Sequence, residues 1–451
     1  MDNFFIEFKK RIYKKEIKIA VVGLGYVGLP LALEFAKKGF DVLGIEIDRG
    51  RLTHHKKRES YITGISNKEL RAILKRGRFN ATGDFGVLNS IDVVIICVPT
   101  PLKRKYHPNI SYIKQAVKSI SKNLKIPSLI ILESTTYPGT TEEVILPLLE
   151  RHNLKHGKDF FLSFSPERID PGNTDYPINK IPKIVGGINK EATDLAVLVY
   201  KNIIDKVVPV SSARVAEVAK LLENTFRLIN IGLVDELAMM AHKMNIDIWE
   251  VIEAASTKPF GFMPFYPGPG VGGHCIPKDP LYLYWKARLH GFKSRFIKLA
   301  SDIITYMPEY VVERVIDVLK LTVTHARQKS WRVRHVLWRK PRTTKILVIG
   351  VTYKKDIKDL RKSPALDIID IFQKKNISVS YYDPLIPYLK LNHIDLKSIR
   401  LNAKTLNAFD CVVIATDHSS VDYNFVLKNS RLIFDTRNVY HGKKNDKVVR
   451  L

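Results

Sequence analysis

Cysteine is scarce in this sequence of 451 residues, which has only Cys97, Cys275 and Cys411. Three cysteines cannot form a disulfide framework, and no Cys or His spacing resembles a zinc site, so we expect no bound metal. Cys97 and Cys411 lie in apolar, strand-like runs that are typical of buried core thiols. This low cysteine content predicts a reducing, cytoplasmic location.

Long hydrophobic runs are also missing. No stretch reaches the roughly 18 consecutive apolar residues of a membrane span, so we expect no transmembrane segment. The first residues are basic and lack the apolar core of an export signal, and they predict a short amphipathic helix. A hydrophobic content of 45% and a charged content of 26% are typical of globular proteins, and 451 residues predict two or three domains.

Acidic residues are outnumbered, with 45 Asp and Glu against 73 Lys and Arg, and the formal net charge is +28. This balance could indicate a nucleic acid, an anionic membrane surface or small anionic substrates. The basic residues are mostly scattered, and their densest cluster is the segment 327–345, where they alternate with Trp331 and Trp338. This segment predicts either a solvated linker between domains or a contact with a polyanion or a membrane. We expect no nucleic-acid partner.

Glycine carries the first motif. A buried strand over 17–22 leads into Gly23-Leu-Gly-Tyr-Val-Gly28, and a helix over 29–39 and a strand over 41–47 follow. This order is the context that the dinucleotide fingerprint requires, with the pyrophosphate at the helix N-terminus. Glu46 should accept hydrogen bonds from the adenine ribose and repel a 2′-phosphate, which favours NAD over NADP, although Arg51 nearby points mildly the other way. The expected NAD contacts here are Gly23, Gly25, Tyr26, Val27, Gly28, Glu46 and Arg51.

Polar residues follow three further predicted strands, over 91–98, 128–132 and 160–164. In a doubly wound sheet, ligands bind outside the carboxyl ends of the strands. Residues that end a strand there are either site residues or ordinary loop caps. The candidates are Thr100, Thr135, Glu167 and Arg168.

The regular alternation of strand and helix stops at about residue 211. The segment 213–243 predicts one long helix, since it contains no proline and only Gly232. Lys220 and Asn224 are four residues apart on it and share one face. An amine beside an amide can stabilise an oxyanion, although a solvated face would have the same pattern.

A second glycine-rich stretch, Gly268 to Pro280, contains a thiol, Cys275, followed by Lys278 and Asp279. A cation near a thiol lowers the pKa of the thiol and favours nucleophilic catalysis, whereas the alternative is a structural loop with an incidental cysteine. The preceding Phe265 and Tyr266 could pack on a base or sugar ring, or belong to the core.

A second α/β domain begins with the strand 344–350, and its first turn lacks GxGxxG. It should not bind a dinucleotide through that turn. Lys354 and Arg361 follow the strand and could hold phosphate. Arg437 follows a later strand over 432–435.

The chain as a whole resembles the nucleotide-sugar 6-dehydrogenases, the UDP-glucose/GDP-mannose dehydrogenase family. The resemblance extends over nearly all residues in order, and its motifs include GLGYVGLP, CVPTPL, ESTTYPGTT, SPERIDPGN, AKLLENTFR, GPGVGGHCIPKDP and KKDIKDLRKSP. It implies an α/β fold with two Rossmann-like doubly wound domains joined by a central helical domain. The expected parts are an NAD-binding domain at 1–210, a helical catalytic and dimerisation domain at 211–330 and a UDP-sugar-binding domain at 331–451. A homodimer through the long helix is also implied.

The resemblance also implies roles for matching residues. Cys275 matches the nucleophile, and the other catalytic positions match Lys220, Asn224, Asp279, Glu167 and Thr135. Further cofactor contacts are implied at Thr100, Thr135, Lys278 and Arg361. Substrate contacts are implied at Glu167, Arg168, Lys220, Asn224, Phe265, Tyr266, Gly272, Lys354 and Arg437.

The activity that this family implies is a four-electron, NAD-dependent oxidation of a UDP-sugar C6 hydroxyl to a carboxylate, for polysaccharide biosynthesis. The stretch before Cys275 resembles the bacterial and archaeal enzymes for UDP-N-acetylglucosamine, with UDP-glucose as the runner-up, followed by UDP-N-acetylgalactosamine or UDP-N-acetylmannosamine. Two other classes remain as alternatives. A two-electron hydroxyacid dehydrogenase would need no thiol, and a polyanion-binding protein would leave the fingerprint unexplained.

Overall fold

The computed structural model describes residues 2–62, 64–103, 106–169, 176–328, 344–391, 394–443 and 445–451. Most of the basic segment 327–345, including both of its tryptophans, lies outside the described residues. The chain forms two compact units, one of residues 1–224 with 278–293, and the other of residues 225–277 with 294–451. These units reflect packing, so the three functional domains predicted from the sequence stay a prediction.

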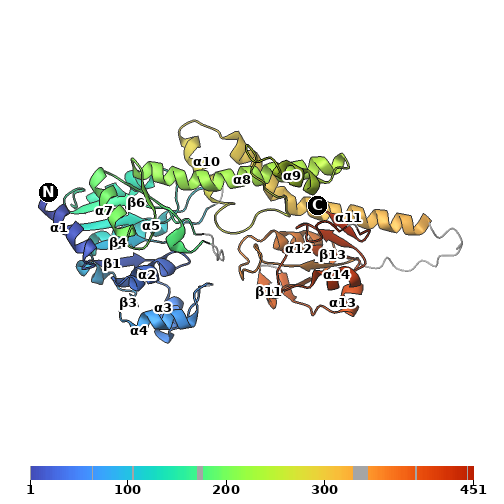
Figure 1. Cartoon of the computed structure of the whole chain (residues 1–451), viewed down its shortest axis with the longest axis horizontal. Coiled ribbons are helices and arrows are strands. Elements are labelled where there is room, and N and C mark those ends of the chain that lie inside the picture. The colour runs from blue at the N-terminus through green and yellow to red at the C-terminus, as the bar shows by residue number, and fades with distance from the viewer. Residues whose placement is uncertain are drawn as a thin grey trace. The chain divides into compact units, whose positions relative to one another are not determined.

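The first unit contains an eight-stranded sheet (Figure 1). Its order, β3-β2-β1-β4-β5-β6-β7-β8, begins with the 3-2-1-4-5-6 order of the dinucleotide-binding fold. All neighbouring strands are parallel except β6 and β7, which are antiparallel. The strands are β1 (Lys18–Val22), β2 (Asp41–Ile45), β3 (Phe79–Thr82), β4 (Val93–Ile96), β5 (Ser128–Leu132), β6 (Phe160–Phe164), β7 (Lys183–Gly187) and β8 (Val207–Pro209).

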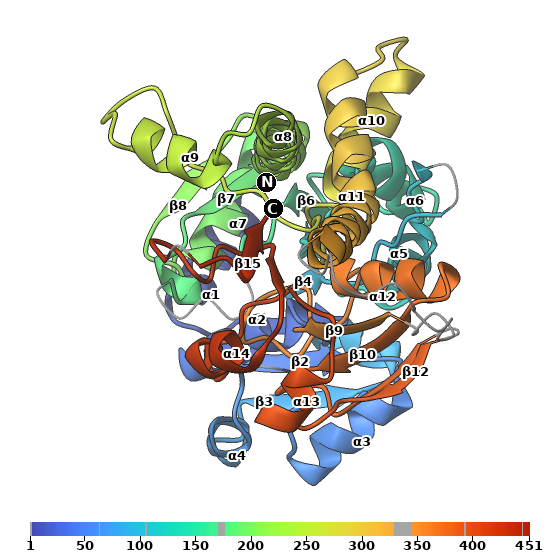
Figure 2. The ribbon, with the colours of Figure 1, turned by 90° about the vertical axis from the view of Figure 1, so that its right-hand side faces the viewer.

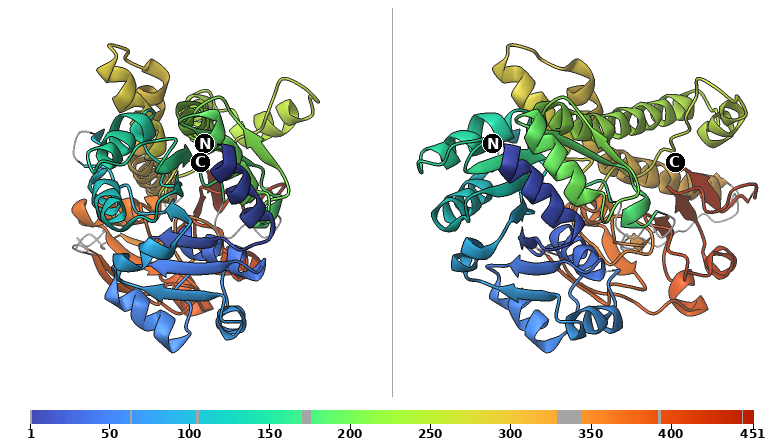
Figure 3. Two further views of the ribbon diagram at one scale, coloured as in Figure 1. Left: turned by 90° about the vertical axis from the view of Figure 1, so that its left-hand side faces the viewer. Right: turned by 60° about the vertical axis from the view of Figure 1, so that its left-hand side comes forward.

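Both faces of this sheet are buried, as the apolar strand sequences predict. In β1, Ile19 and Val21 join the core on one face, while Ala20 and Val22 join the core on the other. Figure 3 shows the N-terminal helix α1 lying along α7, and these two helices are in contact. The helices of this part are α1 (Asp2–Tyr13), α2 (Gly28–Lys37), α3 (Arg49–Lys57), α4 (Asn67–Lys75), α5 (Ser111–Asn123), α6 (Leu146–Glu150) and α7 (Lys190–Tyr200), with short helical turns at Phe85–Ser90, Thr141–Ile145 and Ile178–Lys180.

Four helices follow in the central part of the chain. The long helix α8 (Ala213–Lys243) has the bounds that the sequence predicts. Glycine suits position 232 inside the helix because the backbone of Ala300 approaches closely there. A Cβ at Gly232 would lie 2.9 Å from the Cα of Ala300. The other three are α9 (Ile248–Ser256), α10 (Asp279–Leu289) and α11 (Arg295–Gln328).

The second unit contains a parallel five-stranded sheet in the order β10-β9-β13-β14-β15. This is the other common doubly wound order, in which ligands generally bind at the carboxyl ends of the two strands where the strand order reverses, here β9 and β13. Helices α11 and α12 pack on one face, and α13 and α14 pack on the other (Figure 2). Its elements are β9 (Lys345–Ile349), α12 (Pro364–Lys374), β10 (Ser378–Tyr382), the hairpin of β11 (Tyr388–Leu391) and β12 (Ile394–Lys397), α13 (Ala403–Asn407), β13 (Cys411–Ile414), α14 (Tyr423–Asn429), β14 (Ile433–Asp435) and β15 (Val448–Arg450).

The predicted fold class, with two Rossmann-like domains and a central helical region, is confirmed. In the described part of the chain, every helix is too short or too polar to cross a membrane.

Candidate functional site

The turn between β1 and α2 has the tight backbone that a bound pyrophosphate requires. Gly23 has φ +93°, and a Cβ there would lie 2.7 Å from the carbonyl oxygen of Cys97. A Cβ on Gly28 would overlap the carbonyl oxygen of Gly23, so both positions need glycine. Helix α2 begins directly after Val27 without a side-chain cap, which leaves its first N–H groups for an anion.

Glu46 is buried at the end of β2 and holds the rim of this turn. Its carboxylate accepts hydrogen bonds from the backbone N–H groups of Leu24 and Asp48, each at 3.0 Å. Arg51 donates to the same carboxylate at 3.0 Å, so this cation is paired with Glu46 in the structure. The arrangement fits the ribose of NAD. When NAD is bound, the residues from Gly23 to Gly28 would hold its pyrophosphate and Glu46 its ribose, and NAD would accept hydride.

Three other predicted cofactor residues, Thr100, Thr135 and Lys278, are joined by hydrogen bonds through two backbone carbonyl groups. The Thr100 hydroxyl donates to the carbonyl oxygen of Thr135 at 2.6 Å. The carbonyl oxygen of Thr100 accepts from the Lys278 ammonium at 2.9 Å and from the Tyr282 hydroxyl. Helix α10 is thereby joined to the loops that follow β4 and β5, at the carboxyl edge of the first sheet.

Lys220, Asn224 and Asp279 come together where α8 meets the start of α10. The side-chain amide of Asn224 donates to Asp279 Oδ2 at 2.7 Å, and all three residues are buried. Asp279 Oδ1 is buried without a hydrogen-bond partner among the described residues. Burial raises the pKa of Asp279, while Lys278, Lys220 and Asn224 oppose that rise. This corner therefore holds cations, an amide and a carboxylate with one unsatisfied oxygen, a set that can stabilise an oxyanion and orient a water molecule.

Glu167 and Arg168 follow β6. Glu167 Oε1 accepts from the backbone N–H groups of Arg168 and Ile169 at 2.6 and 2.7 Å, and Glu167 Oε2 lies 3.5 Å from the ammonium of Lys183. The Arg168 guanidinium points instead to Glu223 on α8, at 2.7 Å. Both residues line a cavity of about 10 Å³, which is roughly the room that one water molecule needs.

Sequence reasoning missed two buried carboxylates and a buried lysine of the first unit. Glu133, at the end of β5, pairs with Lys183 at 2.9 Å. Glu217, on α8, accepts from the backbone N–H groups of Gly139 and Thr141 and from the Thr141 hydroxyl. Burial raises the pKa of Glu217 to about 7. A charged residue beside an apolar run is the only sequence signal for such burial, and it does not identify the partner.

The glycine-rich loop that carries Cys275 belongs to the second unit. The Gly268 N–H donates to Asp235 Oδ1 of α8 at 2.9 Å, and the Gly273 N–H donates to the carbonyl oxygen of Arg361 at 2.9 Å. A Cβ on Gly272 would lie 2.5 Å from the Cβ of Tyr353, so this part of the loop packs tightly. The loop is thus anchored at Gly268, to α8, and at Gly273, to the segment that follows β9.

Cys275 is the exposed cysteine, whereas Cys411 is buried and Cys97 largely so. Burial raises the pKa of Cys97 far above its ordinary value and the pKa of Cys411 to about 12. These two thiols are therefore poor nucleophiles, as the sequence predicts for core cysteines.

Three predicted ligand contacts follow strands of the second sheet, namely Lys354 and Arg437 for the substrate and Arg361 for the cofactor. Arg437 follows β14, and its Nε donates to the carbonyl oxygen of Ala415 at 2.8 Å. Its guanidinium also borders the glycine-rich loop, where a Cβ on Gly268 would lie 2.9 Å from it. Lys354 follows β9, and the Arg361 side chain is paired with Asp359 at 2.6 Å.

The aromatic candidates pack against helices. Phe265 contacts Phe226 of α8 edge-to-face, with ring centroids 5.7 Å apart. Tyr266 stacks on Trp249 of α9 at 6.1 Å but keeps 53% of its surface exposed. Half of the Tyr266 surface is therefore available to a ligand.

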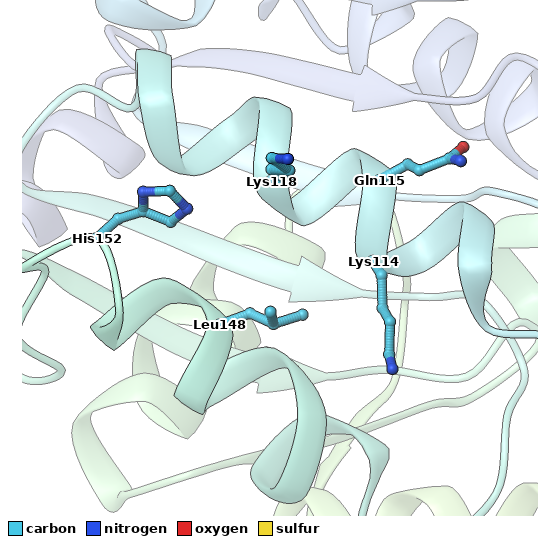
Figure 4. A pocket seen from close by; sticks show the side chains of 5 residues that line it. All are labelled: Lys114, Gln115, Lys118, Leu148 and His152. Carbon is cyan, nitrogen blue, oxygen red and sulfur yellow. The ribbon is translucent and has the colours of Figure 1, made fainter.

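A hollow of about 340 Å³ lies elsewhere, between α5 and α6 (Figure 4). None of the predicted site residues lines it. The lining residues of the hollow are Lys114, Gln115, Lys118, Leu148 and His152.

A metal site is not found among the described residues. In that part of the chain, no three His, Cys, Asp or Glu side chains are grouped so that they could hold a metal ion.

Comparison with known proteins bears on the whole chain. Residues 17–204, 214–304 and 347–442 match the NAD binding domain, the central domain and the UDP binding domain of the UDP-glucose/GDP-mannose dehydrogenase family. The chain is 34% identical over 432 residues to UDP-N-acetyl-D-glucosamine 6-dehydrogenase of Pseudomonas aeruginosa, covering 95% of this chain and 97% of that protein. It is 35% identical over 434 residues to UDP-N-acetyl-D-mannosamine dehydrogenase of Pyrococcus horikoshii, covering 94% and 96%.

Solved structures agree. The structure of the UDP-D-ManNAc dehydrogenase from Pyrococcus horikoshii superimposes with a TM-score of 0.84 at 32% identity, covering 96% of this chain and 99% of that one. An NDP-N-acetyl-D-galactosaminuronic acid dehydrogenase from Methanosarcina mazei Go1 gives 0.79 at 28% identity, covering 98% and 97%. The chain belongs to the UDP-glucose/GDP-mannose dehydrogenase family, and it is an NAD-dependent nucleotide-sugar dehydrogenase.

Proposed function

We propose that the chain oxidises the C6 hydroxyl of UDP-N-acetylglucosamine to a carboxylate in two NAD-dependent steps. The observation that carries the proposal is the buried corner of Lys220, Asn224 and Asp279, which lies in the same unit as the glycine turn of the fingerprint. Such a corner suits a reaction in which negative charge develops on oxygen and a water molecule must be held.

The first step converts the alcohol to an aldehyde. A water molecule held by Asp279 and Thr135 would accept the hydroxyl proton, and NAD, when bound, would supply the acceptor for the C6 hydride. Lys220 and Asn224 donate hydrogen bonds to the oxygen as its charge grows.

Cys275 then retains the aldehyde. Its sulfur adds to C6, a C–S bond forms, and the carbonyl oxygen takes up a proton to give a thiohemiacetal. A second bound NAD would accept the hydride of this adduct, and loss of the hydroxyl proton as well would leave Cys275 as a thioester. A water molecule that Glu167 deprotonates attacks the thioester carbon, the C–S bond breaks, and the thiol and the sugar carboxylate are released.

The identity of the sugar has two candidates. The stretch before Cys275 and the Pseudomonas relative favour UDP-N-acetylglucosamine. The Pyrococcus relative, named for UDP-N-acetyl-D-mannosamine, has a similar identity of 35%, which favours the second candidate. Both carry an N-acetyl group, so we rank them ahead of UDP-glucose.

An assay of the purified protein tests both the reaction and the sugar. Incubation with NAD and limiting UDP-N-acetylglucosamine should release two NADH per sugar, and UDP-N-acetylmannosamine, UDP-N-acetylgalactosamine and UDP-glucose should give lower kcat/KM values. Cys275→Ser should stop after at most one oxidation, and Cys411→Ser is the matched control at a buried thiol. Two NADH per sugar from the Cys275→Ser protein would refute the thioester.

We also propose that the protein is a homodimer joined along α8. One face of this helix carries apolar side chains at intervals of three, four or seven residues, and each is more than one third exposed. A stripe of this kind on a long helix suits a second copy of the same helix. The stripe consists of Val215, Val218, Leu222, Phe226, Leu233 and Met240, and the exposed Met244 follows directly after the helix. A cytoplasmic location and a role in polysaccharide biosynthesis stay predictions.

A further inference from the structure

The carboxyl edge of the first sheet contains a charge network of Lys183, Glu133 and Glu167. The proposed reaction gives a role to Glu167 and none to Lys183 or Glu133. Strands β6 and β7 are antiparallel, and Ser163 pairs with Gly187 and Phe164 with Gly186. Continuing this register three residues further along the chain brings Lys183 opposite Glu167. The first residue of β7 therefore lies beside the carboxylate that follows β6, although 16 residues separate the two in sequence.

Lys183 is shared by two carboxylates. Its Nζ lies 2.9 Å from Glu133 Oε1 and 3.5 Å from Glu167 Oε2. The side chains of Lys183 and Glu133 are 5% and 0% exposed, and that of Glu167 is 11% exposed. The Tyr200 hydroxyl donates to Glu133, and the Lys183 ammonium lies 4.9 Å from the centre of the Tyr200 ring. Lys183 and Glu133 are thus fixed from several sides, while Glu167 faces the small cavity.

Electrostatics keep the ammonium charged. Burial by itself lowers the pKa of Lys183, but attraction by Glu133 and Glu167 outweighs burial, so the pKa of Lys183 is raised. Burial raises the pKa of Glu133, the Glu167 carboxylate raises it further, and Lys183 and Tyr200 act in the opposite direction. A single buried cation therefore serves two carboxylates.

We propose that Lys183 and Glu133 are positioning residues for Glu167. Lys183 holds the Glu167 carboxylate oriented toward the cavity, and Glu133 fixes the ammonium and balances part of its charge. This inference rests on the proposed role of Glu167 as the base that deprotonates water. Neither Lys183 nor Glu133 touches the reacting atoms in this proposal.

The balance of charge gives the two residues opposite effects on the same carboxylate. Without the cation, the partly exposed Glu167 faces the buried Glu133 carboxylate with no compensating charge, so a second negative charge there is disfavoured. Without the negative charge of Glu133, the cation serves Glu167 alone, and ionisation becomes easier. The other titratable groups around the network are Cys97 after β4, Tyr200 on α7, and Arg168 paired with Glu223 on α8.

The pH profile of kcat/KM tests this opposition. In Lys183→Gln, the midpoint of the acid limb should move up by about one pH unit, and kcat should fall at least about tenfold while KM for NAD stays the same. In Glu133→Gln, the acid limb should move down. Lys183→Arg keeps the cation and should restore the wild-type limb, and Lys190→Gln, an exposed lysine on α7, is the matched control.

If the acid limb of the kcat/KM profile shifts equally in both glutamine variants, or in neither, the proposal is overturned. The proposed function would still be supported if the wild-type protein released two NADH per sugar. A readout without turnover separates the two failures. Thermal unfolding of Lys183→Gln, Glu167→Gln and the double variant should show non-additive changes in Tm, since the cation and carboxylate interact. Additive changes would overturn the proposal even in a protein that oxidises no UDP-sugar.

Discussion

The side-chain amide of Asn224 donates to the carboxylate of Asp279 at 2.7 Å, and this contact joins the long helix α8 to the start of α10. The sequence separation is 55 residues, and both side chains are buried. The amide fixes one carboxylate oxygen and leaves the other, Oδ1, as an unsatisfied acceptor among the described residues. An acceptor held in this way is suited to bind a water molecule.

Substitution of Asn224 tests the corner directly. Asn224→Ala removes the donor to Asp279 and, in the proposed mechanism, one hydrogen bond to the developing oxyanion. We expect kcat to fall by about 10²–10³-fold, which is typical for the loss of one oxyanion donor, with KM for NAD unchanged. Steady-state kinetics check the result. Asn230→Ala, which removes an amide that donates to the backbone of its own helix at Phe226, is the control and should retain wild-type kcat.

Cofactor choice should depend on Glu46. Glu46→Gln removes the negative charge that would repel a 2′-phosphate. It also replaces the ion pair between Arg51 and Glu46, at 3.0 Å, with a contact to a neutral amide. We expect the ratio of kcat/KM for NAD to that for NADP to fall at least about tenfold, a change of about 1.4 kcal/mol. Glu46→Asp retains the charge and should keep the preference. An unchanged ratio in Glu46→Gln would show that another residue discriminates between the cofactors.

The fold was largely readable from the sequence because its signals are local. The fingerprint glycines, the apolar strands and the proline-free stretch 213–243 each fix one element. Grouping of Lys220 with Asn224 followed from helical spacing alone. These predictions required no knowledge of which distant segments meet.

The network around Lys183 was not readable for the opposite reason. Its strand, β7, is short and antiparallel to β6, and that reversal is what carries a lysine to the edge where Glu133 and Glu167 end their own strands. A lone lysine before an apolar run gives no indication of this. Similarly, the buried Asp235 accepts a hydrogen bond from the N–H of Gly268, which is 33 residues away in the sequence.

Asp235 should make stability depend on pH. Burial raises the pKa of Asp235 to about 8, against 3.8 in the unfolded chain, while the Gly268 N–H and Arg437 oppose the rise. Between these two pKa values, the folded state holds a proton that the unfolded state has lost. The contribution of Asp235 to the free energy of unfolding is therefore fully present below about pH 4 and falls as the pH rises toward 8. Asp235→Asn keeps an acceptor for Gly268 and removes this loss.

Thermal unfolding across pH 5–9 measures the effect. The advantage of Asp235→Asn over wild type should grow by up to about 1.4 kcal/mol per pH unit and level off above about pH 8. The difference in Tm should be about 2–4 °C per pH unit. Glu250→Gln, an exposed carboxylate on α9, should give a constant difference. Parallel curves for Asp235→Asn and wild type would contradict the prediction.

A charge placed on the exposed face of α8 should separate the proposed dimer. Leu222 and Leu233 are 60% and 50% exposed on this helix, so Leu222→Glu and Leu233→Glu do not disturb the core of one chain. Each would bury a carboxylate against an apolar partner surface, which is strongly unfavourable. Light scattering coupled to gel filtration should give twice 51.6 kDa for the wild type and 51.6 kDa for the double variant. Phe425→Glu, at an exposed apolar residue on α14, is the control and should keep the dimer mass. A dimer mass in the α8 double variant would show that the interface does not lie along this helix.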